Sequence, residues 1–241
     1  MYIEATVTRV VDKGGVCDIH LDIDMELVAG QFVMVWLPRY EEVPMAPSWD
    51  APLRITVKPV GETTEALCRL EPGDKVYVRG PLGRGFEIVR GRYLLIGGGV
   101  GAAPMILAAK QVVEKGGSGV YVEGVKTRDE KLFIEEALEL GLEALLYTED
   151  GSSGRKGLAT DVLRDLDPRG YRILACGPEA MMQSIIQGYS GLDIQLSLER
   201  IVKCGVGVCG SCVLEGTGLL ICLDGPVIHI SRLGGGSKDE G

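Results

Sequence analysis

The stretch YLLIGGGVGA, residues 93–102, decides how the second half of this chain folds. Its first four residues are apolar and predict a short buried strand. The glycines that follow allow an abrupt turn into the helical spacing of residues 102–114. The run GVYVEG, residues 119–124, then predicts another buried strand. A strand, a helix and a second strand in this order form a βαβ unit, which builds a parallel sheet.

The same alternation continues toward the C-terminus. Further strand-like runs are EALLY, YRILAC and DIQLSL, at residues 143–147, 171–176 and 193–198. Possible helices lie at residues 130–140, 158–166 and 178–188. We therefore expect a doubly wound parallel sheet over residues 90–196.

The segments on either side of residues 90–196 differ from it in hydrophobic pattern and composition. Residues 1–89 contain short alternating or apolar runs such as EATVTRVV and DKVYVRG, punctuated by Gly and Pro, which predict a small antiparallel barrel. Residues 197–232 are rich in glycine and cysteine and look too loop-like to continue the parallel sheet. Residues 233–241, which end in GGGSKDEG, are expected to be a flexible tail. The expected fold class is a β barrel plus an α/β domain with a small C-terminal loop region.

Composition and charge exclude several functions. The chain has 241 residues, 46% of them hydrophobic, and a formal net charge of −9. This charge disfavours binding to nucleic acid or to an anionic membrane surface. The longest apolar runs are shorter than the roughly 20 residues that span a bilayer. The N-terminus lacks the basic start and apolar core of a secretory signal, so we expect a cytoplasmic protein.

A reducing compartment changes how the seven cysteines are interpreted. Metal ligation or burial explains them better there than a disulfide framework does. Cys17 and Cys68 lie in strand-like contexts, and we expect both to be ordinary buried thiols.

Four other cysteines have the spacing of an iron–sulfur site. Cys204, Cys209 and Cys212 follow the pattern C-x4-C-x2-C, and Cys222 comes later, as in plant-type [2Fe-2S] proteins. Glycines between the ligands suit a tight loop that turns backbone N–H groups toward the sulfurs. A zinc site would also accept four thiolates, but it usually pairs two short C-x2-4-C knuckles. Four unrelated buried thiols are the remaining alternative.

The glycine-rich turn suits a nucleotide. Residues 97–102 match G-x-G-x-x-A, so a dinucleotide pyrophosphate could lie at the start of the following helix. Glu123 ends the next strand, near the place where an acid would bind the ribose 2′-OH of NAD. Lys126 and Arg128 could instead meet the 2′-phosphate of NADP, and Glu123 could simply be a solvated acid. The candidate glycines are Gly97, Gly98, Gly99 and Gly101.

A second turn is expected at the same edge of the sheet. Cys176, Gly177 and Pro178 follow the strand YRILA, at the carboxyl edge where ligands of such folds bind. A Gly-Pro pair before a helix is also an ordinary turn.

A nucleotide site and an iron–sulfur cluster in one chain imply a third redox group. Nicotinamide exchanges two electrons together as hydride, whereas the cluster passes one at a time. A flavin between them resolves this mismatch, and the N-terminal barrel is the natural place for it.

Nearly the whole chain resembles one family. A barrel followed by GGGVGAAP, CGPEAMM and ERIVKCGVGVCGSC…CLDGPV resembles the electron-transfer subunit of type B dihydroorotate dehydrogenase, a branch of the ferredoxin reductase superfamily. The resemblance implies FAD on the barrel beside an R-P-[LIM]-S motif. Its counterpart here is Val43-Pro44-Met45-Ala46, in which the arginine and the serine are missing. The next contacts that the resemblance implies are Thr56, Val57, Lys58, Thr63 and Thr64.

The resemblance also implies a function. A partner subunit would oxidise dihydroorotate to orotate on its own FMN, in pyrimidine biosynthesis, and this chain would pass the electrons through the cluster and FAD to NAD⁺. It would supply no catalytic acid or base, and the complex would be a heterotetramer with two chains of each kind.

The alternatives from the same class are a subunit of a ferredoxin:NADP oxidoreductase, a sulfide dehydrogenase or a hydrogenase. In the ferredoxin:NADP group the first cluster ligand is typically aspartate, whereas position 204 is cysteine. A zinc-stabilised binding protein is the alternative from another class.

Overall fold

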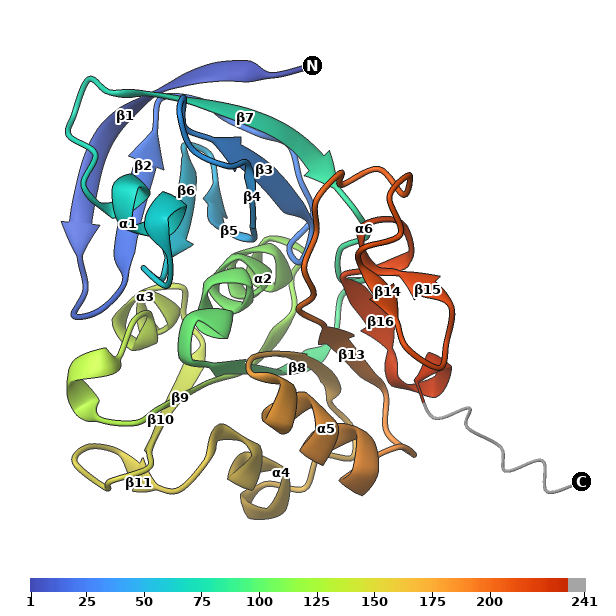
Figure 1. Cartoon of the computed structure of the whole chain (residues 1–241). Coiled ribbons are helices and arrows are strands. Elements are labelled where there is room, and N and C mark those ends of the chain that lie inside the picture. The colour runs from blue at the N-terminus through green and yellow to red at the C-terminus, as the bar shows by residue number, and fades with distance from the viewer. Residues whose placement is uncertain (234–241) are drawn as a thin grey trace, which may run out of the picture.

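The computed structural model describes residues 1–233, which form two seven-stranded sheets (Figure 1). Every strand pairing in the N-terminal sheet is antiparallel, and the order is β4-β3-β7-β1-β2-β6-β5. Its strands are β1 (Ile3–Asp12), β2 (Cys17–Leu21), β3 (Phe32–Trp36), β4 (Val43–Met45), β5 (Pro47–Asp50), β6 (Leu53–Val57) and β7 (Lys75–Leu82), with helix α1 (Glu62–Cys68) before β7. The sheet curls around a buried apolar interior, which confirms the predicted barrel.

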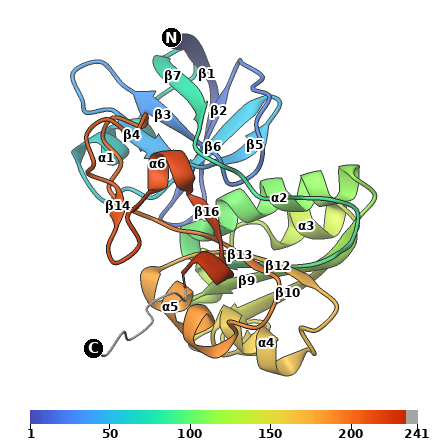
Figure 2. The same ribbon diagram turned by 90° about the vertical axis from the view of Figure 1, so that its right-hand side faces the viewer.

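The second sheet confirms the predicted parallel architecture. Its order is β11-β10-β9-β8-β12-β13-β16, and it is parallel from β11 to β13. Its strands are β8 (Arg92–Gly98), β9 (Ser118–Val125), β10 (Glu143–Thr148), β11 (Arg155–Lys156), β12 (Arg172–Cys176), β13 (Ile194–Ser197) and β16 (Val227–His229). The helices of this part are α2 (Ala102–Glu114), α3 (Ile134–Glu139), α4 (Val162–Asp165) and α5 (Glu179–Gly188). Helices α2 and α3 cover the face toward the barrel, and α4 and α5 cover the other face (Figures 1 and 2).

One expectation about the C-terminal region is wrong. The segment was expected to stay outside the parallel sheet, but β16 pairs antiparallel with β13, with Val227 opposite Ser197. Buried Val227 and Ile228 explain the pairing, because the edge of the sheet covers their apolar side chains. The remaining elements of this region are β14 (Val213–Leu214), β15 (Leu219–Leu220) and α6 (Ile221–Asp224), and short 3-10 turns occur at Gly99–Gly101, Arg128–Glu130, Ala159–Asp161 and Ile230–Arg232.

A second correction concerns Cys17 and Cys68. They form a disulfide across 51 residues of sequence, rather than two separate buried thiols. The barrel lays the last residue of α1 beside the first residue of β2. Sequence spacing could not reveal this, because the pairing depends on how the barrel closes.

The barrel is fixed on the parallel sheet by α2. Side chains of the barrel and of α2 share one apolar core. The Gln111 amide accepts a hydrogen bond from the Ala29 N–H and donates one to the Leu27 carbonyl, each at 2.9 Å. This contact sets the barrel above the sheet and leaves space near the ends of β8 and β12.

Within residues 1–233, no helix is long and apolar enough to span a membrane. The expected tail, 233–241, lies outside the described residues except for Leu233.

Candidate functional site

A cavity of about 400 Å³ lies where the barrel, the parallel sheet and the C-terminal region meet. The barrel contributes β4 and the end of β6, and the parallel sheet contributes the turn at Val100–Gly101 and Cys176. Val202, Ile221 and Pro226 close the cavity from the C-terminal region. The lining is mostly apolar with a few polar groups, which suits a flat aromatic ligand.

Many of the residues expected to contact cofactors line this one cavity. They are Val43, Pro44, Met45, Ala46, Thr56, Lys58, Thr64, Gly101 and Cys176. Thr63 lines an adjoining cavity of about 510 Å³, which shares Val43, Val60 and Thr64 with the first. Val57 is instead fully buried in the barrel core. The fold therefore brings together residues that are far apart in the sequence.

The glycine-rich turn has packing reasons as well as a possible binding role. A Cβ atom on Gly97 would lie 2.6 Å from the Cα of Ala102, and one on Gly98 would lie 2.6 Å from the sulfur of Met181. A Cβ on Gly101 would meet the carbonyl oxygen of Cys176 at 2.6 Å. At Gly99, which has a φ of +53°, a Cβ would meet open space. Gly99 is thus the turn position whose backbone a ligand can approach most freely.

The structure contradicts the ribose contact expected of Glu123. This side chain is fully buried beside strand β8, and its carboxylate accepts hydrogen bonds from the backbone N–H groups of Leu132 and Phe133. The Tyr121 hydroxyl donates a third at 3.4 Å. Burial raises the pKa of Glu123, although the two backbone donors oppose that shift. The acid therefore stabilises the segment before α3 and is not available to a ribose hydroxyl.

Cys176 and its neighbours form the wall of the cavity at the end of β12. The Cys176 thiol is buried, opposite Ser197 of β13, and burial raises its pKa to about 12, so the thiol is neutral. Gly177 lines a neighbouring cavity beside α5, and Pro178 directly precedes that helix. The end of β12 thus offers a small neutral surface to a ligand in the cavity.

The four cysteines of the C-terminal region lie in two neighbouring pairs. Cys204 and Cys209 lie close enough to affect each other's pKa, and so do Cys212 and Cys222. The Gly207 N–H donates to the Cys222 sulfur at 3.2 Å, and the Cys222 N–H donates to the Cys212 sulfur at 3.4 Å. Among the described residues no three candidate ligands converge closely enough for a single metal ion.

The backbone conformation of the glycines explains why N–H groups point toward the cysteine sulfurs. Gly205, Gly207 and Gly210 have φ values of +70°, +78° and +72°, a region that favours glycine. Backbone N–H groups, that of Val206 first, lower the pKa of the Cys204 thiol to about 6, whereas burial raises that of Cys222 to about 11. Thiols as donors and N–H groups turned toward sulfur are the chemistry that an iron–sulfur cluster needs.

Arg79 joins the cysteine loop to the barrel, a contact that sequence reasoning missed. Its guanidinium donates to the Cys204 carbonyl at 3.2 Å and pairs with Glu42 at 2.9 Å. Glu42 directly precedes the strand β4 that lines the main cavity. No local motif signals this contact, because 125 residues separate Arg79 from Cys204.

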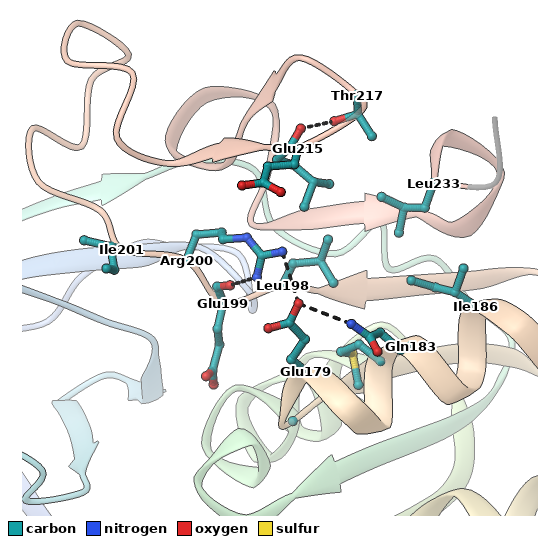
Figure 3. A pocket seen from close by; sticks show the side chains of 13 residues that line it. Glu179, Gln183, Ile186, Leu198, Glu199, Arg200, Ile201, Glu215, Thr217 and Leu233 are labelled. Atoms are coloured by element: carbon teal, nitrogen blue, oxygen red, sulfur yellow. Dashed lines mark hydrogen bonds and ion pairs between the residues drawn. The ribbon is translucent and has the colours of Figure 1, made fainter. Parts of the chain in front are cut away.

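A further cavity of about 550 Å³ separates α5 from the C-terminal region (Figure 3). Arg200 reaches across it to Glu179 at 3.4 Å, and Gln183 also donates to Glu179 at 3.3 Å. This ion pair ties the start of the C-terminal region to α5.

Together, the curled antiparallel barrel, the parallel sheet with its glycine turn and the cysteine loop define a ferredoxin reductase-like oxidoreductase. Comparison with known proteins gives the family. Residues 199–234 match the iron-sulfur cluster binding domain of dihydroorotate dehydrogenase B, and residues 95–187 match the oxidoreductase NAD-binding domain.

Relatives over nearly the full length agree with these matches. The chain is 42% identical to a probable dihydroorotate dehydrogenase B (NAD(+)), electron transfer subunit, of Methanocella arvoryzae, covering 93% of this chain and 89% of that one. A protein of the same description from Thermococcus kodakarensis is 38% identical, covering 94% and 98%. The chain thus belongs to the family of dihydroorotate dehydrogenase B electron transfer subunits, which confirms the resemblance found in the sequence.

A solved structure shares the architecture. It is a chain of an NADH-dependent reduced ferredoxin-NADP oxidoreductase studied for flavin-based electron bifurcation. It is 30% identical, with a TM-score of 0.83 over 95% of this chain and 88% of that chain.

Proposed function

We propose that this chain carries electrons from a dihydroorotate-oxidising partner to NAD⁺, by way of a [2Fe-2S] cluster and FAD. The observation that carries the proposal is the shared cavity, whose wall combines barrel strand β4, the nucleotide turn at Gly101 and residues beside the cysteine loop. Flavin exchanges both single electrons and hydride, so it belongs between the other two groups.

Each part of the chain would then have one task. Residues 1–89 would hold FAD, 90–196 would hold NAD and 197–232 would hold the cluster. Cys204, Cys209, Cys212 and Cys222 would be the cluster ligands. Val202 and Ile221, close in sequence to those ligands, also line the main cavity, which supports a short distance between cluster and flavin.

The chain's own residues would bind and orient the groups rather than supply an acid or a base. Pro44 and Met45 offer an apolar surface to the flavin ring, and Gly99 lets the backbone approach the nucleotide pyrophosphate. Neutral Cys176 would pack where flavin and nicotinamide meet. Because it carries no charge, it would not bias the hydride step electrostatically.

The surface beside the cysteine loop supports docking of the partner there. Ile201, Val206, Val208 and Leu223 are apolar and exposed by 73%, 49%, 84% and 48%, and Cys209 among them is exposed. Such a group of apolar side chains is typical of a protein interface. We propose that the partner is an FMN-containing dihydroorotate dehydrogenase subunit, joined in a cytoplasmic heterotetramer with two chains of each kind.

Reconstitution tests the proposal. The chain alone should reduce artificial acceptors with NADH but should not oxidise dihydroorotate, whereas mixing it with the FMN-containing subunit should create NAD⁺-linked oxidation. Cys222→Ser is the informative variant. If it loses the cluster and keeps FAD, NADH-to-dye activity should survive while dihydroorotate-to-NAD⁺ transfer collapses. Unchanged coupled activity in a complex without cluster would refute the route.

A ferredoxin:NADP-type role is the second candidate, supported by the solved structure described above. Lys126 and Arg128 follow strand β9 and could meet a 2′-phosphate there. Comparing kcat/KM for NADH and NADPH separates the two, because a clear preference for NADPH would favour this candidate.

A further inference from the structure

The second cavity, of about 510 Å³, lies beside the proposed flavin site and shares three lining residues with it, Val43, Val60 and Thr64. FAD carries a flat apolar ring and, linked to it, a diphosphate with negative charge. The main cavity offers apolar side chains such as Phe32 and Met45 that suit the ring. An FAD molecule whose ring fills the main cavity must place its diphosphate in adjoining space.

Cations decide where a diphosphate can lie, because phosphate oxygens need charged or polar donors. Arg39 is the one basic residue among the described residues that line the second cavity; Glu41 and Glu62 are the acids there. The missing arginine of the flavin motif falls at Val43, on the shared wall. Arg39 therefore places a positive charge in the cavity whose wall lacks the motif arginine at Val43.

The backbone at Arg39 is unusual. It has a φ of +80°, and among residues 1–233 no other residue except glycine has a positive φ. Arg39 sits in the loop between β3 and β4, in a turn closed by a hydrogen bond from the Tyr40 N–H to the Leu37 carbonyl at 2.9 Å. Its side chain is exposed, and its guanidinium makes no hydrogen bond or ion pair with residues 1–233. The φ of +80° is that of the third position of a type II turn with Pro38 at the second, so the turn fixes where the Arg39 side chain leaves the backbone.

We propose that Arg39 binds the diphosphate of FAD and replaces the arginine that the flavin motif lacks at Val43. This inference rests on the proposed function, since it takes FAD as the bound flavin. Lys58 and Arg200 are cations of the main cavity, but Lys58 interacts with the charge of Glu199 there and Arg200 pairs with Glu179. Without Arg39, the diphosphate would face the carboxylates of Glu41 and Glu62 alone.

The test compares FAD with riboflavin, which has the same ring and no phosphate. Flavin-free protein is titrated with each ligand, and binding is followed by the quenching of flavin fluorescence. Arg39→Gly is the main variant because glycine adopts a φ of +80° without strain, so the loop should keep its shape. Arg39→Lys retains a charge without the forked donor, and Arg9→Gln, an exposed position on β1 outside these cavities, makes the same change in net charge elsewhere.

We expect Arg39→Gly to weaken FAD binding by roughly tenfold to a hundredfold, the effect of losing a charge-assisted hydrogen bond. Riboflavin affinity should stay unchanged, and the melting temperature should not fall, because glycine adopts this φ without strain. Arg39→Lys should be intermediate, and Arg9→Gln should match the wild type. Unchanged FAD affinity in Arg39→Gly, or equal losses for FAD and riboflavin, would overturn the inference while leaving the proposed function intact. A wild-type chain that binds no FAD would overturn both.

Discussion

Gly207→Ala should release the iron–sulfur cluster faster. Gly207 has a φ of +78°, and its N–H donates to the Cys222 sulfur at 3.2 Å. An added Cβ would lie 2.7 Å from the Cγ of Leu223, well inside contact distance. The substitution therefore combines a backbone penalty with a clash beside a proposed cluster ligand.

The two effects have different sizes. The left-handed conformation costs alanine about 1–2 kcal/mol. Leu223 is 48% exposed, so it can turn aside, and an off-rotamer side chain costs about 1 kcal/mol. We expect a total near 2–3 kcal/mol, of which about 1 kcal/mol belongs to the clash.

Gly210→Ala isolates the clash, because Gly210 has a similar φ of +72° and a Cβ there would meet nothing within 4 Å. The assay is loss of visible absorbance on addition of an iron chelator under anaerobic conditions. Gly207→Ala should lose its cluster about fivefold faster than Gly210→Ala, as about 1 kcal/mol implies. Equal rates for the two variants would refute the reasoning about Leu223.

Three further changes test other parts of the structure. Cys17→Ser combined with Cys68→Ser should lower the free energy of unfolding by about 4 kcal/mol under oxidising conditions, as the 51-residue separation implies, and should leave the iron content unchanged; equal stability of the oxidised wild type and the variant in urea would contradict this. The pKa of Glu123 is raised in the folded protein, so its protonated form stabilises the fold below the usual value of 4.5, and this contribution is lost as pH rises through the raised value. The glutamine of Glu123→Gln does not titrate. The free energy of unfolding of the wild type, measured in urea, should therefore fall relative to that of Glu123→Gln as pH rises, and a relative increase would show the opposite shift. Arg54→Met should destabilise by about 1–2 kcal/mol because it removes the hydrogen bonds from the largely buried guanidinium to Glu136 at 2.7 Å and Ser48 at 2.9 Å; a thermal melt unchanged from the wild type would count against it.

The sequence alone determined the elements whose signals are local. The glycine turn after residues 93–96 and the helical spacing of 102–114 predicted β8 and α2, because periodicity reports which face of an element is buried. The cysteine spacing singled out Cys204, Cys209 and Cys212 because ligands that share one loop have a fixed spacing along the chain. The resemblance to one family extended these local signals to the whole chain.

Tertiary structure alone decided which distant groups meet. Glu123 looked like an exposed acid at a strand end, yet the segment before α3 folds over it and its oxygens bind backbone N–H groups. Cys17 and Cys68 became partners only because the barrel closes across 51 residues. Arg79 reaches the Cys204 carbonyl through a contact that no motif encodes. Spacing along the chain describes neighbours in one element, whereas these contacts depend on how whole elements pack, so only the fold could reveal them.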